Sequence, residues 1–118
     1  MNRVSIAATL AVLLVALPAT AQTVQPDWIT ATNQNCKLWN PQPEANESVT
    51  WSGGCKDGLA SGKGVLKWTL NGKPDVEFDG EYQNGKRNGP GVMVAPDGKR
   101  VAGVWVNDQL LAPDGGAI

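Results

Sequence analysis

The sequence predicts an all-β fold: a single elongated antiparallel sheet of consecutive β-hairpins, with a disulfide-pinned cap at its N-terminal end. Three observations predict this fold. A pattern of glycines and aromatic residues recurs along the second half of the chain, apolar and polar residues alternate within each copy, and two cysteines stand on either side of the point where the first copy begins. Internal repetition combined with a period of two is typical of stacked strand pairs.

Composition restricts the possible functions. The 118 residues include 10 Lys plus Arg, 11 Asp plus Glu and no His. Nucleic-acid binding by counterion release needs clustered cations, and this balance provides none. Histidine, the commonest general base and metal ligand, is missing, and two cysteines alone do not complete a tetrahedral zinc site. We therefore expect one small domain that is not an enzyme and needs no cofactor.

The first segment of the chain, residues 1–21, is predicted to be a secretory signal peptide. Arg3 precedes an apolar run from Val4 to Leu17, and small residues follow the run up to Ala21. The run is shorter than the roughly 20 residues of a spanning helix and has no polar face, so it fits neither a membrane anchor nor a surface helix. Cleavage after Ala21 predicts a bacterial protein that is periplasmic or secreted, with no transmembrane segment.

The next segment, residues 22–48, is expected to form the cap. In an oxidising compartment Cys36 and Cys55 are predicted to form a structural disulfide, because no CxxC motif and no His would activate a thiol. The closed loop would stabilise the fold by roughly 3 kcal/mol in the chain-entropy model. Cys55 falls on the inner face of the sheet, so the bridge would hold the segment around Cys36, with Trp28 and Trp39, over the first strand edge.

Residues 49–112 are predicted to form about two and a half repeats, and residues 113–118 a C-terminal tail. The segment Phe78–Val92 aligns with Trp51–Val65 at an offset of 27 residues, with four glycines coinciding. A shorter third copy starts at Val101 and loses the second half of the pattern. A degenerate last copy is common at the end of a stacked array.

Alternation within the copies predicts the register of two strand pairs. An antiparallel pair across residues 69–75 places Leu66 opposite Phe78 on the inner face and Lys63 opposite Glu81 on the outer face. Opposite charges across strands stabilise such a pair, and a slip of one residue would lose the charge pairs and the apolar face together.

The next pair is predicted to place Met93 opposite Val101 and Gly91 opposite Gly103, around a three-residue turn at 96–98. Three turn residues ending in glycine suit a type I turn closed by a left-handed glycine. We further expect the glycines of each GxG pair to form a slot in the strand. The aromatic ring of the following copy would lie across this slot and compensate for the missing side chains.

The second copy resembles a MORN repeat, whose pattern is an aromatic residue, a glycine, an acidic residue, a second aromatic and then spaced glycines ending in GxG. The resemblance extends from Trp51 to about Leu110, although Gly54 stands at the acidic position of the first copy and Cys55 at its second aromatic. The motif positions are Trp51, Gly53, Gly58, Gly62, Gly64, Phe78, Gly80, Glu81, Tyr82, Gly85, Gly89, Gly91, Gly103 and Trp105. The resemblance implies a row of β-hairpins and roles in protein interaction, oligomerisation or, in some members, phospholipid binding.

A non-enzymatic module for protein–protein interaction or self-assembly in the bacterial envelope is therefore the function we expect. Repeat arrays offer extended binding faces. The strand Val101–Val106 would also leave an open C-terminal edge able to accept a strand from a partner or from a second copy. The alternative at this edge is that Leu110–Ile118 folds back and covers it.

Phospholipid head-group binding is the alternative function. It is suggested by the resemblance and by two adjacent cations, Lys86 and Arg87, in a loop expected over Gln83–Asn88. Polybasic lipid recognition generally uses about four to eight such residues, so this pair is weak support.

Catalysis or calcium binding by carboxylates is a further alternative, with Glu77, Asp79 and Glu81 as its candidates. Alternation places all three on the outer face of a strand rather than in a cleft or a ligand-wrapping loop. The sequence therefore predicts no catalytic residue, no metal site and no cofactor.

Overall fold

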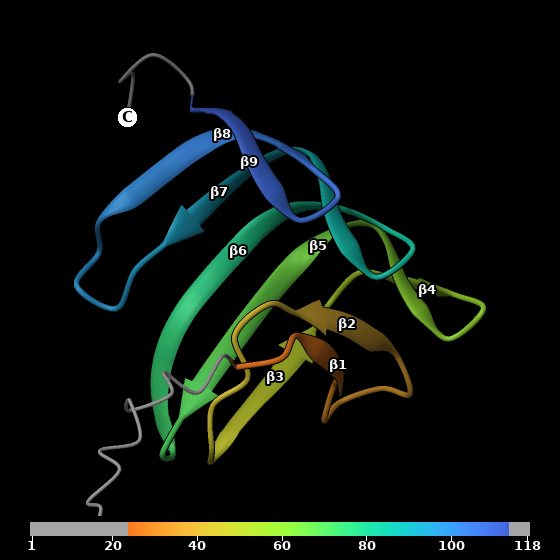
Figure 1. The fold of residues 1–118 in the computed structure, drawn as a ribbon, viewed down its shortest axis with the longest axis vertical. Helices are drawn as coiled ribbons and strands as arrows, with labels where there is room; N and C mark the ends of the chain where they lie inside the picture. The colour runs from red at the N-terminus through yellow and green to blue at the C-terminus, as the bar shows by residue number, and fades with distance from the viewer. Residues whose placement is uncertain (1–23, 114–118) are drawn as a thin grey trace, which may run out of the picture.

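The computed structural model describes residues 24–113, which form a single nine-stranded sheet (Figure 1). The signal peptide predicted over 1–21 and all but the first residue of the tail predicted over 113–118 lie outside the described residues. The described part of the chain contains no helix with the length and hydropathy of a membrane span. The strands are β1 (Asp27–Thr30), β2 (Lys37–Asn40), β3 (Glu47–Trp51), β4 (Gly54–Lys56), β5 (Leu59–Leu70), β6 (Lys73–Gln83), β7 (Lys86–Val94), β8 (Arg100–Val106) and β9 (Gln109–Pro113).

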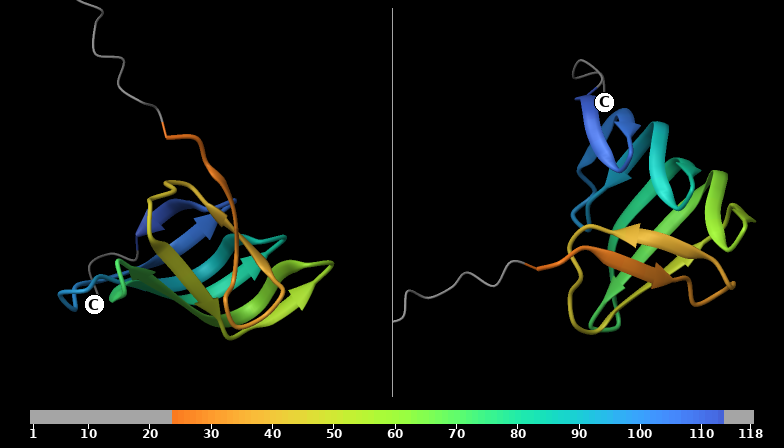
Figure 2. Two further views of the ribbon diagram at one scale, coloured as in Figure 1. Left: turned by 90° about the horizontal axis from the view of Figure 1, so that it is seen from below. Right: turned by 45° about the vertical axis from the view of Figure 1, so that its right-hand side comes forward.

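The sheet is all-β, as predicted, but it is mixed and strongly curled rather than elongated and purely antiparallel. The order is β1-β2-β5-β6-β7-β8-β9, with β3 and β4 also paired to β5. A parallel contact joins β2 to β5 at Lys37 and Leu59. Irregular registers in three of the strand pairs add local bending to the ordinary twist of the strands. The result is a half-barrel whose concave side is crossed by β1 and β2 (Figure 2).

Both predicted registers are confirmed. Leu66 lies opposite Phe78 in the β5–β6 pair, and Met93 lies opposite Val101 in the β7–β8 pair. Lys63 and Glu81 are register partners too, but the ion pairs formed among residues 24–113 are elsewhere. The outer-face charges therefore match the register without being held in salt bridges.

Tight turns set the length of most hairpins. Two-residue turns in which both φ angles are positive join four strand pairs, and they are Asp57-Gly58, Asn71-Gly72, Asn84-Gly85 and Asn107-Asp108. Such turns match the twist of the strands, and Asn, Asp and Gly tolerate their backbone. The predicted three-residue turn is confirmed, since Gly98 has φ of 88° and its N–H donates to the Ala95 carbonyl at 2.9 Å. The loops expected over 69–75 and 83–88 are wrong, and Lys86 and Arg87 lie in β7.

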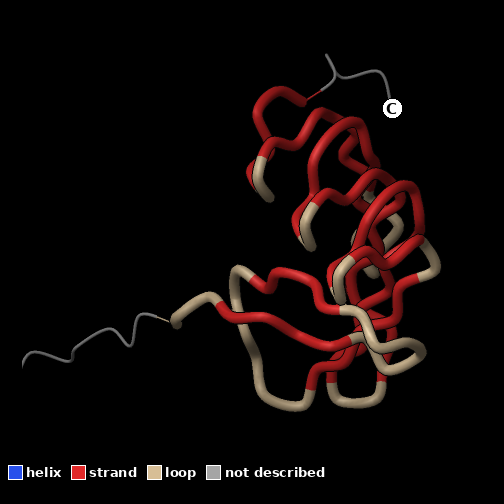
Figure 3. The backbone as a smooth tube through the Cα atoms, turned by 90° about the vertical axis from the view of Figure 1, so that its right-hand side faces the viewer, coloured by secondary structure: helices blue, strands red, loops and turns tan. Residues whose placement is uncertain are grey.

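The turns on one side of the sheet stack in a row (Figures 1 and 3). The N–H of Gly85 donates to the carbonyl of Ala60 at 2.9 Å, and the N–H of Asp108 donates to the carbonyl of Arg87 at 2.8 Å. Each turn is thus tied to the start of the strand that follows the previous turn. This contact repeats from one hairpin to the next and aligns the copies.

A row of aromatic rings fills the inner face. Ring centroids are 4.8 Å apart for Trp51 and Tyr82, 5.8 Å for Tyr82 and Phe78, and 4.9 Å for Phe78 and Trp105. All four side chains are buried, and their tilted or edge-on contacts are the arrangements that aromatic pairs favour. The aromatic positions of successive copies therefore form one continuous core.

Glycines make room for these rings, but the expected pairing of ring and slot is wrong. A Cβ on Gly80 would lie 2.8 Å from the Phe78 ring, and one on Gly91, its cross-strand partner, would overlap the same ring. Likewise a Cβ on Gly64 would lie 2.7 Å from the Trp51 ring. Each slot thus holds the first aromatic of its own copy, because that side chain leans along its strand over the glycine two residues ahead.

The cap segment is bridged to the sheet by the predicted Cys36–Cys55 disulfide, with a Cα–Cα distance of 5.8 Å. Cys36 is fully buried, whereas Cys55 is exposed although its cross-strand partner Ala60 is buried. The loop before Cys36 covers the free edge of β3: the N–H of Thr32 donates to the Val49 carbonyl at 2.8 Å, and the Asn33 amide exchanges hydrogen bonds with the Trp51 backbone. This loop therefore shields the first strand edge.

The strand β2 lies along the row of turns. Its Lys37 N–H donates to the Gly58 carbonyl at 2.8 Å, and its Trp39 N–H donates to the Gly85 carbonyl at 2.7 Å. Trp28, on β1, packs edge-on against Trp39 and covers Gly85. The cap thus reaches from the turns across the concave side of the sheet, where it forms one wall of a groove.

Candidate binding surfaces

A groove of about 300 Å³ lies between the cap and the concave face of the sheet. The cap contributes Trp39 from β2, Glu44 from the following loop and Glu47 from the start of β3. The sheet contributes apolar and aromatic side chains from β5, β6 and β7, namely Leu66, Trp68, Val76, Phe78, Tyr82 and Met93. Sequence reasoning missed this groove, because it depends on how far the cap folds over the sheet.

One wall of the groove contains a buried ion pair. Arg87 Nε donates to Asp108 Oδ1 at 2.7 Å, and one terminal nitrogen donates to Oδ2 at 3.1 Å and to the Asp108 carbonyl at 3.0 Å. The two side chains are 13% and 5% exposed. The guanidinium also lies over the rings of Phe78 and Trp105, 5.7 and 5.9 Å from their centroids. The charges of Arg87 and Asp108 therefore compensate each other.

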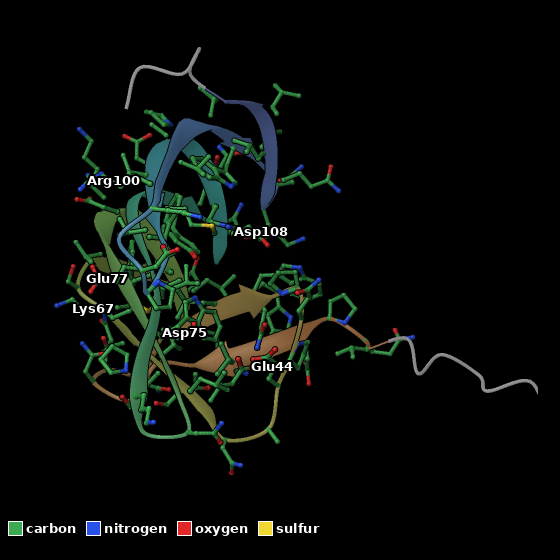
Figure 4. All side chains as sticks on the ribbon, turned by 90° about the vertical axis from the view of Figure 1, so that its left-hand side faces the viewer. Glu44, Lys67, Asp75, Glu77, Arg100 and Asp108 are labelled. Carbon is green, nitrogen blue, oxygen red and sulfur yellow. A yellow bond between two sulfur atoms is a disulfide. The ribbon has the colours of Figure 1, made fainter. Side chains whose placement is uncertain are left out.

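Acidic groups line the rest of the groove. Glu47 accepts hydrogen bonds from the Asn40 amide at 2.5 Å and from the Glu44 N–H at 2.9 Å, which fixes the loop between them. Glu44 and Asp75 also line the groove, and neither forms an ion pair with a described residue. Figure 4 shows Glu44, Asp75 and Asp108 on the groove side, whereas Lys67, Glu77 and Arg100 project from the convex face. The groove is therefore negatively charged.

Tyr82 brings a polar group to the floor of the groove. The residue is 4% exposed, and its hydroxyl makes no hydrogen bond to any described residue. No polar side-chain atom in residues 24–113 is both fully buried and unpaired, so this hydroxyl keeps access to the groove. Burial raises the pKa of the Tyr82 phenol well above its usual value of 10.0, because the phenolate would lose its hydration.

Tyr82 is the single tyrosine of the chain, so its titration can be followed by absorbance. We expect the native protein to form phenolate only at a pH above 10.0, and the unfolded chain to form it near that value. Because the folded pKa is raised, the neutral phenol stabilises the fold below pH 10.0 and this contribution is lost as the pH rises towards the folded pKa. A native titration that coincides with the titration in denaturant would contradict the burial of this ring.

The C-terminal end of the sheet is a second candidate surface. Of the two outcomes expected for the edge Val101–Val106, the open edge is wrong, and the chain folds back instead, because β9 pairs antiparallel with β8 and covers it. The terminal strand of the described sheet is therefore β9. Most of the exposed large apolar side chains among the described residues gather on these two strands, and they are Val101, Val104, Val106, Leu110 and Leu111.

The charged candidates of the sequence do not form a common site. Arg87 is paired with Asp108, and the Lys86 ammonium lies 4.8 Å from the centre of the Trp39 ring. Glu77 and Asp79 line a depression on the convex face. Residues 24–113 contain no group of three or more His, Cys, Asp or Glu side chains placed to hold a metal ion.

The family model of the MORN repeat matches residues 50–69 and 78–100. The chain carries two MORN repeats. Each match contains a slot aromatic, Trp51 or Phe78, with the glycines beneath its ring. The third copy lies beyond the matched residues, yet β8 and β9 extend the same sheet. Neither the curated proteins nor the solved structures gave a match to this chain.

Sequence reasoning also missed Asp108 as a partner of Arg87. A signal was present, because Asp108 stands where the first two MORN repeats have the turn glycines Gly58 and Gly85. An acidic side chain at a position that favours glycine has a reason other than backbone conformation.

Proposed function

We propose that this protein is exported from a bacterial cell and acts there as a non-enzymatic module that self-associates through the β9 edge. The presence of MORN repeats supports a binding role, because such repeats are generally binding modules. The observation that carries the proposal is the apolar character of the terminal strand pair. Leu111, on β9, is 72% exposed, the highest value among the large apolar side chains of the described residues.

A second copy fits this edge because the residues of β9 before Pro113 carry no charge. Natural edge strands are usually blunted by charged residues or by an internal proline. The segment Gln109–Ala112 carries no charge, and proline follows only at Pro113. Two β9 strands that pair antiparallel around a two-fold axis would bring identical apolar side chains together without repulsion between like charges.

The proposed export depends on the leader at residues 1–21. If the leader directs secretion, the protein recovered from the periplasm or the medium should begin at Gln22, as read by mass spectrometry of the intact chain. The Cys36–Cys55 bridge is consistent with an oxidising compartment.

Self-association is tested with the mature chain, residues 22–118, by sedimentation or light scattering across a concentration series. We expect dimers that dissociate on dilution. Leu111→Lys should shift the protein to monomers, because it places like charges on facing edges. Val24→Lys is the matched control, since Val24 is 56% exposed and lies outside the edge, and it should leave the dimer intact.

The proposal fails if the unaltered chain is monomeric at every concentration, or if the two lysine variants behave alike. Crosslinking in intact cells then asks whether β9 meets a different protein, which would retain the binding role and replace the second copy. Phospholipid head-group binding gains no support here, because Arg87 is paired with Asp108 and Lys86 lies over Trp39.

A further inference from the structure

We propose that the groove between the cap and the sheet binds a small organic cation, an aliphatic amine or guanidine, whose charged head lies between Tyr82 and the groove carboxylates. This site is separate from the β9 edge and goes beyond the proposed self-association. Three features of the groove point to such a ligand: a hydroxyl that opens onto the groove without a partner among the described residues, an excess of negative charge and aromatic walls.

The hydroxyl of Tyr82 is the first feature. The ring of Tyr82 is buried, and its hydroxyl opens onto the groove without a hydrogen-bond partner among the described residues. Tyr82 is 4% exposed and held between Trp51 and Phe78, so its ring is not free to turn its hydroxyl elsewhere. Its hydroxyl can accept a hydrogen bond from an ammonium or guanidinium group that enters the groove.

Negative charge is the second feature. Glu44, Glu47 and Asp75 line the groove, and Arg87 is the single basic side chain among its described lining residues. Because Arg87 is already paired with Asp108, it does not neutralise the other three carboxylates. An anionic ligand would be repelled, and a cation would be attracted.

Aromatic walls are the third feature. Trp39, Trp68 and Phe78 line the groove, and cations bind favourably over such rings. Two of these rings already hold a cation of the chain itself: the Lys86 ammonium lies over Trp39, and the Arg87 guanidinium lies over Phe78. An aliphatic stem would pack against the apolar side chains of the groove.

The size of the groove restricts the ligand. About 300 Å³ stands at the lower end of the range of roughly 300–1,000 Å³ for small-molecule pockets. This volume admits a short amine or guanidine. The ligand class is therefore a short aliphatic chain with a cationic end.

The probes are cadaverine and agmatine, titrated into the mature protein by calorimetry, with the fluorescence of the groove tryptophans as a second readout. The matched negative probes are pentanol, which lacks the charge, and glutarate, which reverses it. We expect both cations to bind. Pentanol and glutarate should bind at least about tenfold more weakly, and added salt should weaken the binding of both cations.

Two variants locate the site. Tyr82→Phe removes only the hydroxyl. It should weaken the binding of cadaverine about three- to tenfold, the range expected for one lost hydrogen bond. Its melting temperature should hardly change, because the hydroxyl has no partner among the described residues. Asp75→Asn should weaken the binding of cadaverine by a similar factor. Asp79→Asn is its matched control, since Asp79 lies on the same strand but borders the convex face, and it should bind as the unaltered chain does.

The proposal is overturned if neither cation binds, if pentanol binds as well as cadaverine, or if Asp75→Asn and Asp79→Asn weaken binding equally. The β9 variant Leu111→Lys separates this result from self-association. It should lose the dimer and keep its affinity for cadaverine, because Leu111 does not line the groove.

Discussion

Replacing Phe78 with alanine is expected to lower the free energy of unfolding by about 3–5 kcal/mol, the cost typical of deleting a buried aromatic side chain. Phe78 is 1% exposed and contacts Tyr82, Trp105 and the Arg87 guanidinium. Its removal opens a cavity where the two MORN repeats and the third copy meet. Chemical denaturation followed by tryptophan fluorescence measures the change. A loss below about 1 kcal/mol would mean that the aromatic row is not the core.

Gly91 provides a control, because the effect expected from substituting it does not follow from a loss of buried apolar area. Gly91→Ala should destabilise the native chain, because the new methyl would overlap the Phe78 ring. In the Phe78→Ala background the ring is gone, so the same change at Gly91 should cost less. This positive coupling in a double-mutant cycle is the signature of the ring lying in the glycine slot. Additive effects of the two substitutions would contradict the slot.

The strands and their registers could be predicted because the information is local. Alternation with a period of two and the spacing of glycines place Leu66 opposite Phe78 without any knowledge of the rest of the molecule. The turns were in principle as readable, since Asn71-Gly72 and Asn84-Gly85 are strong signals for two-residue hairpin turns. Loops predicted from the period alone are too long, because the period does not show where a two-residue turn lies.

The curl of the sheet and the groove could not be predicted in this way. Both depend on contacts between segments far apart in the sequence, such as Trp39 donating to Gly85 and Lys37 donating to Gly58. No periodicity in the sequence of the cap indicates these hydrogen-bond partners. The sequence likewise does not decide between an open and a covered C-terminal edge, because the turn before β9, Asn107-Asp108, lacks a glycine.

Substituting Asp108 with alanine is expected to destabilise the protein by about 3–5 kcal/mol, because removing one member of a buried ion pair leaves the other without a counter-charge. The Arg87 guanidinium would remain over Phe78 and Trp105 with its 2.7 Å partner gone. Alanine at this turn position would also be strained, since φ is 71°. Thermal unfolding followed by circular dichroism reads the combined effect.

Three further variants separate the two causes. Asp108→Gly restores the residue type of the other turns, so it should relieve the backbone strain, keep the unpaired charge and fall between the native chain and Asp108→Ala. Combining it with Arg87→Met removes the unpaired charge and should recover part of the lost stability. Lys99→Ala is the surface control: its pair with Asp97 is 3.8 Å long and highly exposed, so its loss should change stability by less than about 1 kcal/mol. If Asp108→Gly matched the native chain, the ion pair would contribute nothing, and Asp108 would be a turn residue alone.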